Sequence, residues 1–149
     1  MSRAKPLITG ATESQVSSGV VDAFAAFGVE LIRQNAGGFR NSDGQYVPAA
    51  PKYSSDYRGT FPAHFGPAAG KSFGVEIKKE SFDPERVRGK ERERFLGQVA
   101  KLRELNAVGG YGFWCSDPTA IPRILTAIKD GWTIDVSEDG QQWLDDGIP

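Results

Sequence analysis

The chain has 149 residues, of which 39% are hydrophobic and 25% are charged, and its net charge is −1. This size and composition predict one globular domain over residues 1–149 with its own hydrophobic core. No stretch is apolar for long enough to cross a bilayer, and the first residues lack the apolar run of a signal peptide. We therefore expect an intracellular, cytoplasmic protein with no membrane partner.

The single cysteine and the single histidine limit the kinds of metal site that the chain could form. Cys115 alone cannot make an internal disulfide or a cysteine-rich zinc site, and His64 alone cannot make a histidine cluster. Any metal ion would therefore be held mostly by oxygen atoms. Oxygen ligands indicate Mg²⁺ or Mn²⁺.

The charges are unevenly distributed along the chain. From residue 129 to the end there are one basic and six acidic residues, whereas residues 1–128 hold 17 basic and 13 acidic ones. We interpret this as a mildly basic core, at about 12–128, followed by an acidic C-terminal extension, 129–149. A basic core permits contacts with phosphate groups but does not require them.

The first predicted element is a helix that begins after Thr12. Thr12 and Gln15 have the spacing of a capping box, apolar residues then recur at helical spacing, and Gly28 ends the pattern. Glu13 falls in the first turn, where the helix dipole favours a carboxylate. Taken alone, this structural role is the simpler explanation for Glu13.

A strand is expected at 29–33, and the polar stretch that follows, 35–62, is longer than an ordinary connection. Basic residues and tyrosines alternate in this stretch and just before it, namely Arg33, Arg40, Lys52, Arg58, Tyr46, Tyr53 and Tyr57. This composition suits contacts with a nucleic-acid backbone and stacking on bases. A flexible surface excursion that contains an edge hairpin is an equally good interpretation.

The segment 73–79 predicts a buried strand. Side chains two residues apart share a face of a strand, so Glu76 and Lys78 lie together, opposite the apolar side chains of Phe73, Val75 and Ile77. The pair could hold a metal ion and a water molecule. The alternative is an antiparallel strand with a solvated polar face.

A charged and then amphipathic helix is predicted from Asp83-Pro84 to about Asn106. Gln98 falls near its buried face, where it must find partners in the backbone or in an active site. The basic residues of the first half are nearly balanced by glutamates, which indicates a solvated surface more than a dedicated DNA clamp.

The rest of the chain predicts a strand at 111–115, a helix that begins after Ser116 or Asp117, and a last strand at 132–136. The order of these elements predicts an α/β protein in which helices cover a sheet.

The ordered set of motifs resembles the virus-type replication-repair nuclease (VRR-NUC) family of the PD-(D/E)xK nuclease superfamily, over roughly residues 12–128. The set comprises a helix that begins with Glu13, a hairpin with the glycine-rich segment 59–66, the strand Val75-Glu76-Ile77-Lys78, a helix that carries Gln98, and a Gly-Gly pair before a strand. Any one of these motifs is weak, and the ordered set is much stronger.

The resemblance implies a restriction-endonuclease-like fold, in which helices flank a mixed central β-sheet, and Mg²⁺- or Mn²⁺-dependent hydrolysis of DNA phosphodiester bonds. Small phage members of the family act on branched DNA such as Holliday junctions, often as homodimers. The resemblance therefore implies that this chain is a homodimeric DNA-repair endonuclease for four-way junctions or flaps. It would be located in the host cytoplasm if a phage encodes it.

The resemblance also assigns roles to individual residues. Glu76 matches the metal-binding acid, the carbonyl of Ile77 matches the backbone ligand, and Lys78 would orient or activate the attacking water. Glu13 and Gln98 would complete the catalytic site. Expected contacts with the DNA backbone come from Arg40, Lys52, Arg58 and Lys79.

One position departs from the family pattern. The chain reads Pro62-Ala63-His64, so Ala63 stands where the metal-bridging aspartate of the catalytic and metal sites is expected. Alanine cannot bind a metal, and we therefore expect an impaired nuclease. Its origin could be an engineered Asp→Ala substitution, which we favour, a natural pseudonuclease, or a register in which His64 takes over. The alternative functions are a non-catalytic DNA-binding module and a protein-interaction domain that uses the aromatic-rich loop.

Overall fold

The computed structural model describes residues 10–34, 38–48 and 52–146. The two ends of the expected domain and two parts of the expected long loop, 35–37 and 49–51, lie outside the described residues. The helices are α1 (Glu13–Ala26), α2 (Gly89–Ala107) and α3 (Ile121–Lys129), and the short 3-10 turns are η1 (Gly66–Ala68) and η2 (Pro118–Ala120). The strands are β1 (Ile32–Arg33), β2 (Gly38–Arg40), β3 (Tyr46–Pro48), β4 (Tyr57–Thr60), β5 (Ser72–Ile77), β6 (Tyr111–Cys115), β7 (Thr133–Val136) and β8 (Gln142–Asp145).

The central sheet of the described residues is mixed and has the strand order β1-β4-β5-β6. β4 is antiparallel to both β1 and β5, whereas β5 and β6 are parallel. The predicted α/β class and a mixed central sheet flanked by helices are thereby confirmed. The capping box at Thr12 is also present, with Gln15 as the reciprocal partner.

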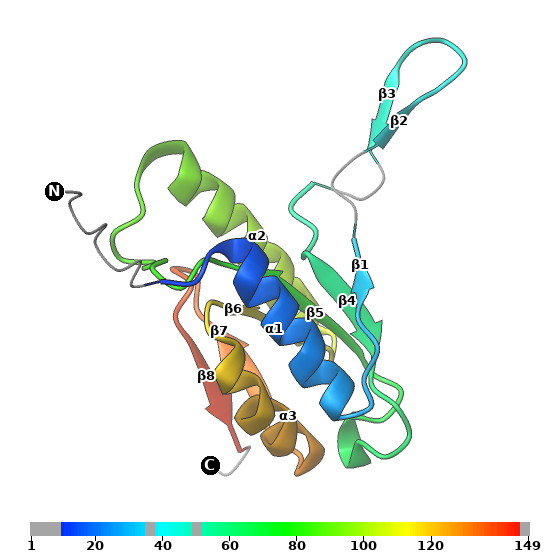
Figure 1. Ribbon diagram of the computed structural model, residues 1–149, viewed down its shortest axis with the longest axis vertical. Helices are drawn as coiled ribbons and strands as arrows, with labels where there is room; N and C mark the ends of the chain where they lie inside the picture. Colours follow the sequence, from blue (N-terminus) through cyan, green and yellow to red (C-terminus); the bar gives the residue numbers. More distant parts are fainter. Residues whose placement is uncertain (1–9, 35–37, 49–51, 147–149) are drawn as a thin grey trace, which may run out of the picture.

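The two faces of β5 meet different helices. On one face Phe73 stacks on Phe24 of α1, with 5.3 Å between ring centroids, and α3 lies beside α1 (Figure 1). On the other face α2 crosses β5 and β6 at glycine positions. A Cβ atom on Gly112 would lie only 2.7 Å from the backbone oxygen of Leu102, so this glycine allows α2 to approach the sheet closely.

The stretch 35–62, which the sequence predicts to be one long loop, contains three strands, β2, β3 and β4. The β2–β3 hairpin projects away from the body of the molecule, and its return leads into β4 (Figure 1). On this return Tyr53 adopts a φ of 65° and its ring lies against Gly97 of α2, where a Cβ atom would be 2.6 Å from the ring. The contact anchors the segment that leads into β4.

The segment after residue 128 is part of the packed molecule. Ile134 and Val136 of β7 are buried in the same core as the central sheet. The side-chain amide of Gln142 bonds to both backbone groups of Trp114, at 3.1 and 2.6 Å, and so satisfies the free edge of β6. The acidic extension is therefore not a separate tail over its described part.

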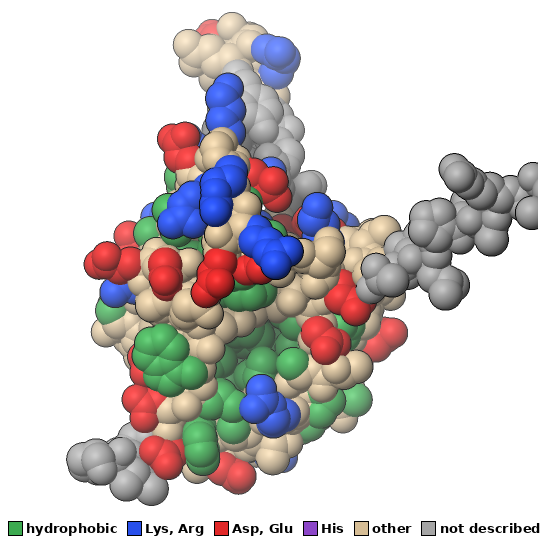
Figure 2. All heavy atoms as spheres, turned by 90° about the vertical axis from the view of Figure 1, so that its left-hand side faces the viewer, with side chains coloured by type: hydrophobic (Ala, Val, Ile, Leu, Met, Phe, Trp, Pro, Cys, Tyr) green, Lys and Arg blue, Asp and Glu red, His purple; other side chains and the backbone are tan. Residues whose placement is uncertain are grey.

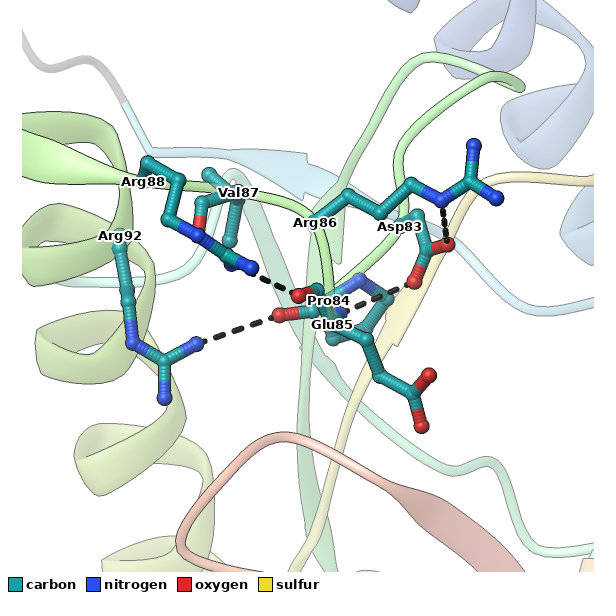
Figure 3. A network of polar contacts seen from close by, with 7 residues as sticks. All are labelled: Asp83, Pro84, Glu85, Arg86, Val87, Arg88 and Arg92. Atoms are coloured by element: carbon teal, nitrogen blue, oxygen red, sulfur yellow. Dashed lines mark hydrogen bonds and ion pairs between the residues drawn. The ribbon is translucent and has the colours of Figure 1, made fainter.

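The predicted start of the second helix is wrong, because residues 83–88 form a turn before α2 (Figure 3). The side chain of Asp83 accepts from the backbone N–H of Glu85, and Arg88 donates to the carbonyl of Glu85 at 2.7 Å. Arg92 donates from the helix to the carbonyl of Pro84. These bonds satisfy backbone groups outside a helix, and the helix begins only at Gly89.

None of the helices in the described parts of the chain is long and apolar enough to cross a membrane.

The close approach of α2 to β6 can be tested by Gly112→Ala. Because the new Cβ atom would meet backbone at Leu102, we expect the free energy of unfolding to fall by about 1–3 kcal/mol in urea denaturation. Gly10→Ala is the control, since its Cβ atom would meet its neighbours at an ordinary 3.7 Å. Equal stability of the two variants would contradict this account of the packing.

Candidate functional site

Glu76 is a buried carboxylate at the end of β5, with only 3% of its surface exposed. Its Oε1 accepts a hydrogen bond from Nε2 of Gln98 at 2.9 Å. Its Oε2 has no hydrogen-bond donor among the described residues. A buried carboxylate oxygen without a donor is costly, and in native proteins such an atom often marks a missing ion or water.

Asp56 lies beside Glu76, immediately before β4. The register pairs Tyr57 with Val75, so the chain before β4 runs past the end of β5. The carboxylate of Asp56 accepts the backbone N–H of Ile77 at 2.7 Å. This bond fixes one carboxylate next to the other, and the two carboxyl groups can bond to each other only if one carries a proton.

The environment makes ionisation of Glu76 unfavourable. Burial is the largest cause, the negative charge of Asp56 is the next, and together they raise the pKa of Glu76 to about 9. The positive charge of Lys78 acts in the opposite direction and is smaller. A divalent cation between the two carboxylates would remove the repulsion and partner the free Oε2 atom.

Lys78 completes a chain of hydrogen bonds that starts at Glu76. Its Nζ donates to Oε1 of Gln98 at 2.7 Å, so Gln98 connects the acid and the amine. Nζ also lies 5.2 Å from the ring centroid of Phe82 and 5.5 Å from that of Phe95. Burial lowers the pKa of Lys78, an effect that the charge of Glu76 opposes and that of Arg94 reinforces.

Glu13 stands at the rim of this cluster. The backbone of Ala11 exchanges hydrogen bonds with Glu80, both with its backbone and with its carboxylate, and this pairing fixes the start of α1 beside the end of β5. Glu13 lines a hollow of about 230 Å³ with Asp56 and a second hollow of about 170 Å³ with Glu76 and Lys78. Its exposed carboxylate thus faces both sides of the acid pair.

The structure does not bring Ala63 to the site, which corrects its placement from the sequence. β4 pairs with β5 so that Thr60 faces Ser72, at the opposite end of β5 from Glu76. Ala63 follows Thr60 and lies exposed in the turn beyond that end. The neighbouring His64 bonds through Nε2 to the carbonyl of Phe27 at 2.8 Å, so a register in which His64 takes over is also wrong.

The acidic residue beside Glu76 is Asp56, whereas Ala63 lies at the other end of β5. The sequence signal was present, because Asp56 directly precedes the short strand that forms a hairpin with β5. That strand lies inside the stretch 35–62, whose composition predicts one long loop. The register of the hairpin therefore decides which residue reaches Glu76.

The residues expected to contact DNA are dispersed. Lys79 lines the hollow that contains Glu76 and Lys78, whereas Arg58 is exposed on β4. Lys52 lies over the ring of Tyr53 at 4.9 Å, and Arg40 donates to the carbonyl of Gly44 within the projecting hairpin. Only Lys79 therefore lines a hollow of the candidate site.

The donor set fits a hard divalent cation. Asp56 and Glu76 offer carboxylate oxygens, and the free Oε2 atom of Glu76 provides a ligand that the protein leaves unused. No group of three or more His, Cys, Asp or Glu residues with metal-site geometry occurs in the parts of the chain that the structure describes. Carboxylate oxygens are the ligands that Mg²⁺ and Mn²⁺ prefer, and Mg²⁺ normally needs only one or two of them because it keeps several waters.

Comparison of the chain with protein-family models, with curated proteins and with solved structures found no significant match in any of the three.

The buried charge of Glu76 predicts a pH-dependent stability in the presence of a chelator. In the unfolded chain Glu76 ionises near pH 4.5, but in the folded chain only near pH 9, so the wild type should lose stability as the pH rises between these values. Glu76→Gln removes this loss. We expect the variant to be more stable than the wild type at pH 8 in urea denaturation with EDTA.

Glu93→Gln, at an exposed position of α2, is the matched control and should follow the wild type at every pH. Parallel pH profiles for the wild type and Glu76→Gln would show that Glu76 carries no unfavourable charge.

Proposed function

We propose that this chain is a divalent-metal-dependent DNA endonuclease with a site of the PD-(D/E)xK type. The observation that supports the proposal best is the connected cluster of Asp56, Glu76, Gln98 and Lys78 at one end of the sheet. Asp56 precedes one strand of an antiparallel hairpin, and Glu76 and Ile77 end the other strand.

Asp56, Glu76 and the carbonyl of Ile77 would hold Mg²⁺ or Mn²⁺. A bound divalent ion supplies neutralisation of phosphodiester charge and a lowered pKa for a bound water. Asp56 also keeps its carboxylate oriented through the N–H of Ile77. The two acids therefore provide oxygen ligands in a fixed arrangement.

Lys78 would orient the attacking water and stabilise the negative charge that develops on the phosphate. Its ammonium is held by Gln98, so its position does not depend on the substrate. The amide of Gln98 fixes Glu76 in the same way. Glu13, at the rim, would accept hydrogen bonds from waters on the substrate side.

The proposed site is complete without any change at residue 63. Ala63 lies beyond the far end of β5, so an alanine there does not remove a ligand. We therefore propose that the enzyme is active, because the alanine at position 63 does not impair the site.

Asp56→Asn and Ala63→Asp test whether residue 56 or residue 63 is the position of the metal-binding aspartate. With Mg²⁺ or Mn²⁺ we expect the wild type to cut a four-way junction or a flap in preference to linear duplex. Asp56→Asn should reduce the rate at least ~100-fold through loss of a charged ligand. Ala63→Asp should leave the rate unchanged. Denaturing gels of labelled strands give the rates.

A thermal shift provides an independent readout of the same assignments. Mn²⁺ should raise the melting temperature of the wild type and of Ala63→Asp, but not that of Asp56→Asn. Absence of cleavage of all these DNAs by the wild type would refute the proposed activity. Cleavage that appears only in Ala63→Asp would refute the assignment of Asp56.

A four-way junction has two strands to cut, and a homodimer with two sites matches its two-fold symmetry. If a four-way junction is the substrate, light scattering coupled to size-exclusion chromatography should show two chains per particle. We expect this for the free protein or for the protein part of its complex with DNA. A protein that stays monomeric on a junction would instead favour flap or nick cleavage.

A further inference from the structure

Two hollows adjoin the candidate site, and each contains an arginine. The first is lined by Arg33 together with Asp56 and Glu13. The second is lined by Arg94 together with Glu76, Lys78 and Glu13. Glu13 lines both hollows, and each hollow contains one residue of the acid pair, Asp56 in the first and Glu76 in the second.

Arg94 differs from the other arginines at the start of α2. Arg88 and Arg92 donate to backbone carbonyls of the turn before the helix, and Arg86 pairs with Asp83 at 3.5 Å (Figure 3). Arg94 makes no hydrogen bond or ion pair with any residue in the described ranges, and it is exposed. It precedes Gln98 by one helical turn, so both side chains lie on the same face of α2.

Arg33 has the same properties in the hollow that contains Asp56. It is the last residue of β1, pairs with Tyr57 in the sheet and is exposed. Its guanidinium forms no hydrogen bond or ion pair with the residues that the structure describes, although Glu13 and Asp56 line the same hollow.

The face of the molecule in Figure 2 does not form a uniform basic patch. Figure 2 shows Lys and Arg side chains gathered on the upper part of one face with acidic side chains between them. Binding of a polyanion must therefore depend on particular guanidinium groups. Arginine is suited to this role because its planar fork binds two oxygens of one phosphate.

We propose that Arg33 and Arg94 bind the phosphates on the two sides of the bond that is cut. The strand then runs from the hollow of Arg33, past Glu13 and the acid pair, to the hollow of Arg94. This inference rests on the proposed nuclease function. It assigns phosphate-binding roles to Arg33 and Arg94 and gives the path of the substrate strand between the two hollows.

The test is a DNA-binding titration with Ca²⁺ in place of Mg²⁺, using a labelled four-way junction and several salt concentrations. Arg33→Ala and Arg94→Ala should each raise Kd about tenfold. Each should also lower the slope of log Kd against log salt by about 0.7–0.9, the loss of one phosphate contact. Arg33→Lys and Arg94→Lys keep the charge and should recover the slope but only part of the affinity.

Arg123→Ala is the matched control, since it removes an exposed arginine of α3 that lines neither hollow. It should leave Kd and the salt slope unchanged. The cleavage rates of all variants with Mn²⁺ are measured in parallel.

Unchanged Kd and salt slope for both alanine variants, with active wild type and inactive Asp56→Asn, would overturn the strand path and leave the nuclease function standing. A wild type that neither binds nor cuts DNA would overturn both. Circular dichroism shows whether each alanine variant folds. If one does not, the lysine variant at the same position tests the proposal. An affinity for DNA equal to that of the wild type would then contradict a bidentate phosphate contact.

Discussion

The arrangement of the candidate site depends on one hydrogen bond, from the backbone N–H of Ile77 to the carboxylate of Asp56. In the β4–β5 hairpin a backbone carbonyl would ordinarily accept this N–H, but β4 begins only at Tyr57. The side chain of Asp56 takes the place of that carbonyl. A carboxylate is thereby fixed at the end of the ladder, next to Glu76, and the end of the sheet becomes an acidic site.

The second constraint is the burial of Glu76 beneath α2. The helix can lie this close because glycines occur where it meets the sheet, notably Gly112. The same closeness brings Gln98 within hydrogen-bonding distance of both Glu76 and Lys78. Burial makes a charge on Glu76 unfavourable, which is a cost in stability that functional sites commonly carry and that a cation would offset.

Local patterns in the sequence were sufficient for some elements and not for others. The capping box at Thr12 and the buried strand that contains Phe73, Val75 and Ile77 involve neighbours in the chain, and both predictions are confirmed. The partner of Glu76 across the hairpin depends on where the stretch 35–62 returns to the sheet. The anchoring of Tyr53 on Gly97 determines that return, and it joins residues 44 positions apart. The start of α2 was missed for a similar reason, since Arg92 bonds back to the turn.

The balance of charge around Asp56 and Glu76 indicates that a divalent cation would bind before a phosphodiester strand. The two hollows are lined by the acids Glu13, Asp56, Glu76 and Glu91 and by the bases Arg33, Lys78, Lys79 and Arg94, so with every group ionised they are neutral together. With Glu76 protonated, as its raised pKa favours, three acids face four bases and the same groups carry one net positive charge. Because a proton on Glu76 and a cation at its carboxylate would compete for the same oxygens, binding of a divalent cation would release the proton and raise the net charge by one. In the proposed nuclease the cation would therefore strengthen the attraction for a phosphodiester strand, and Arg33 and Arg94 would determine where that strand lies.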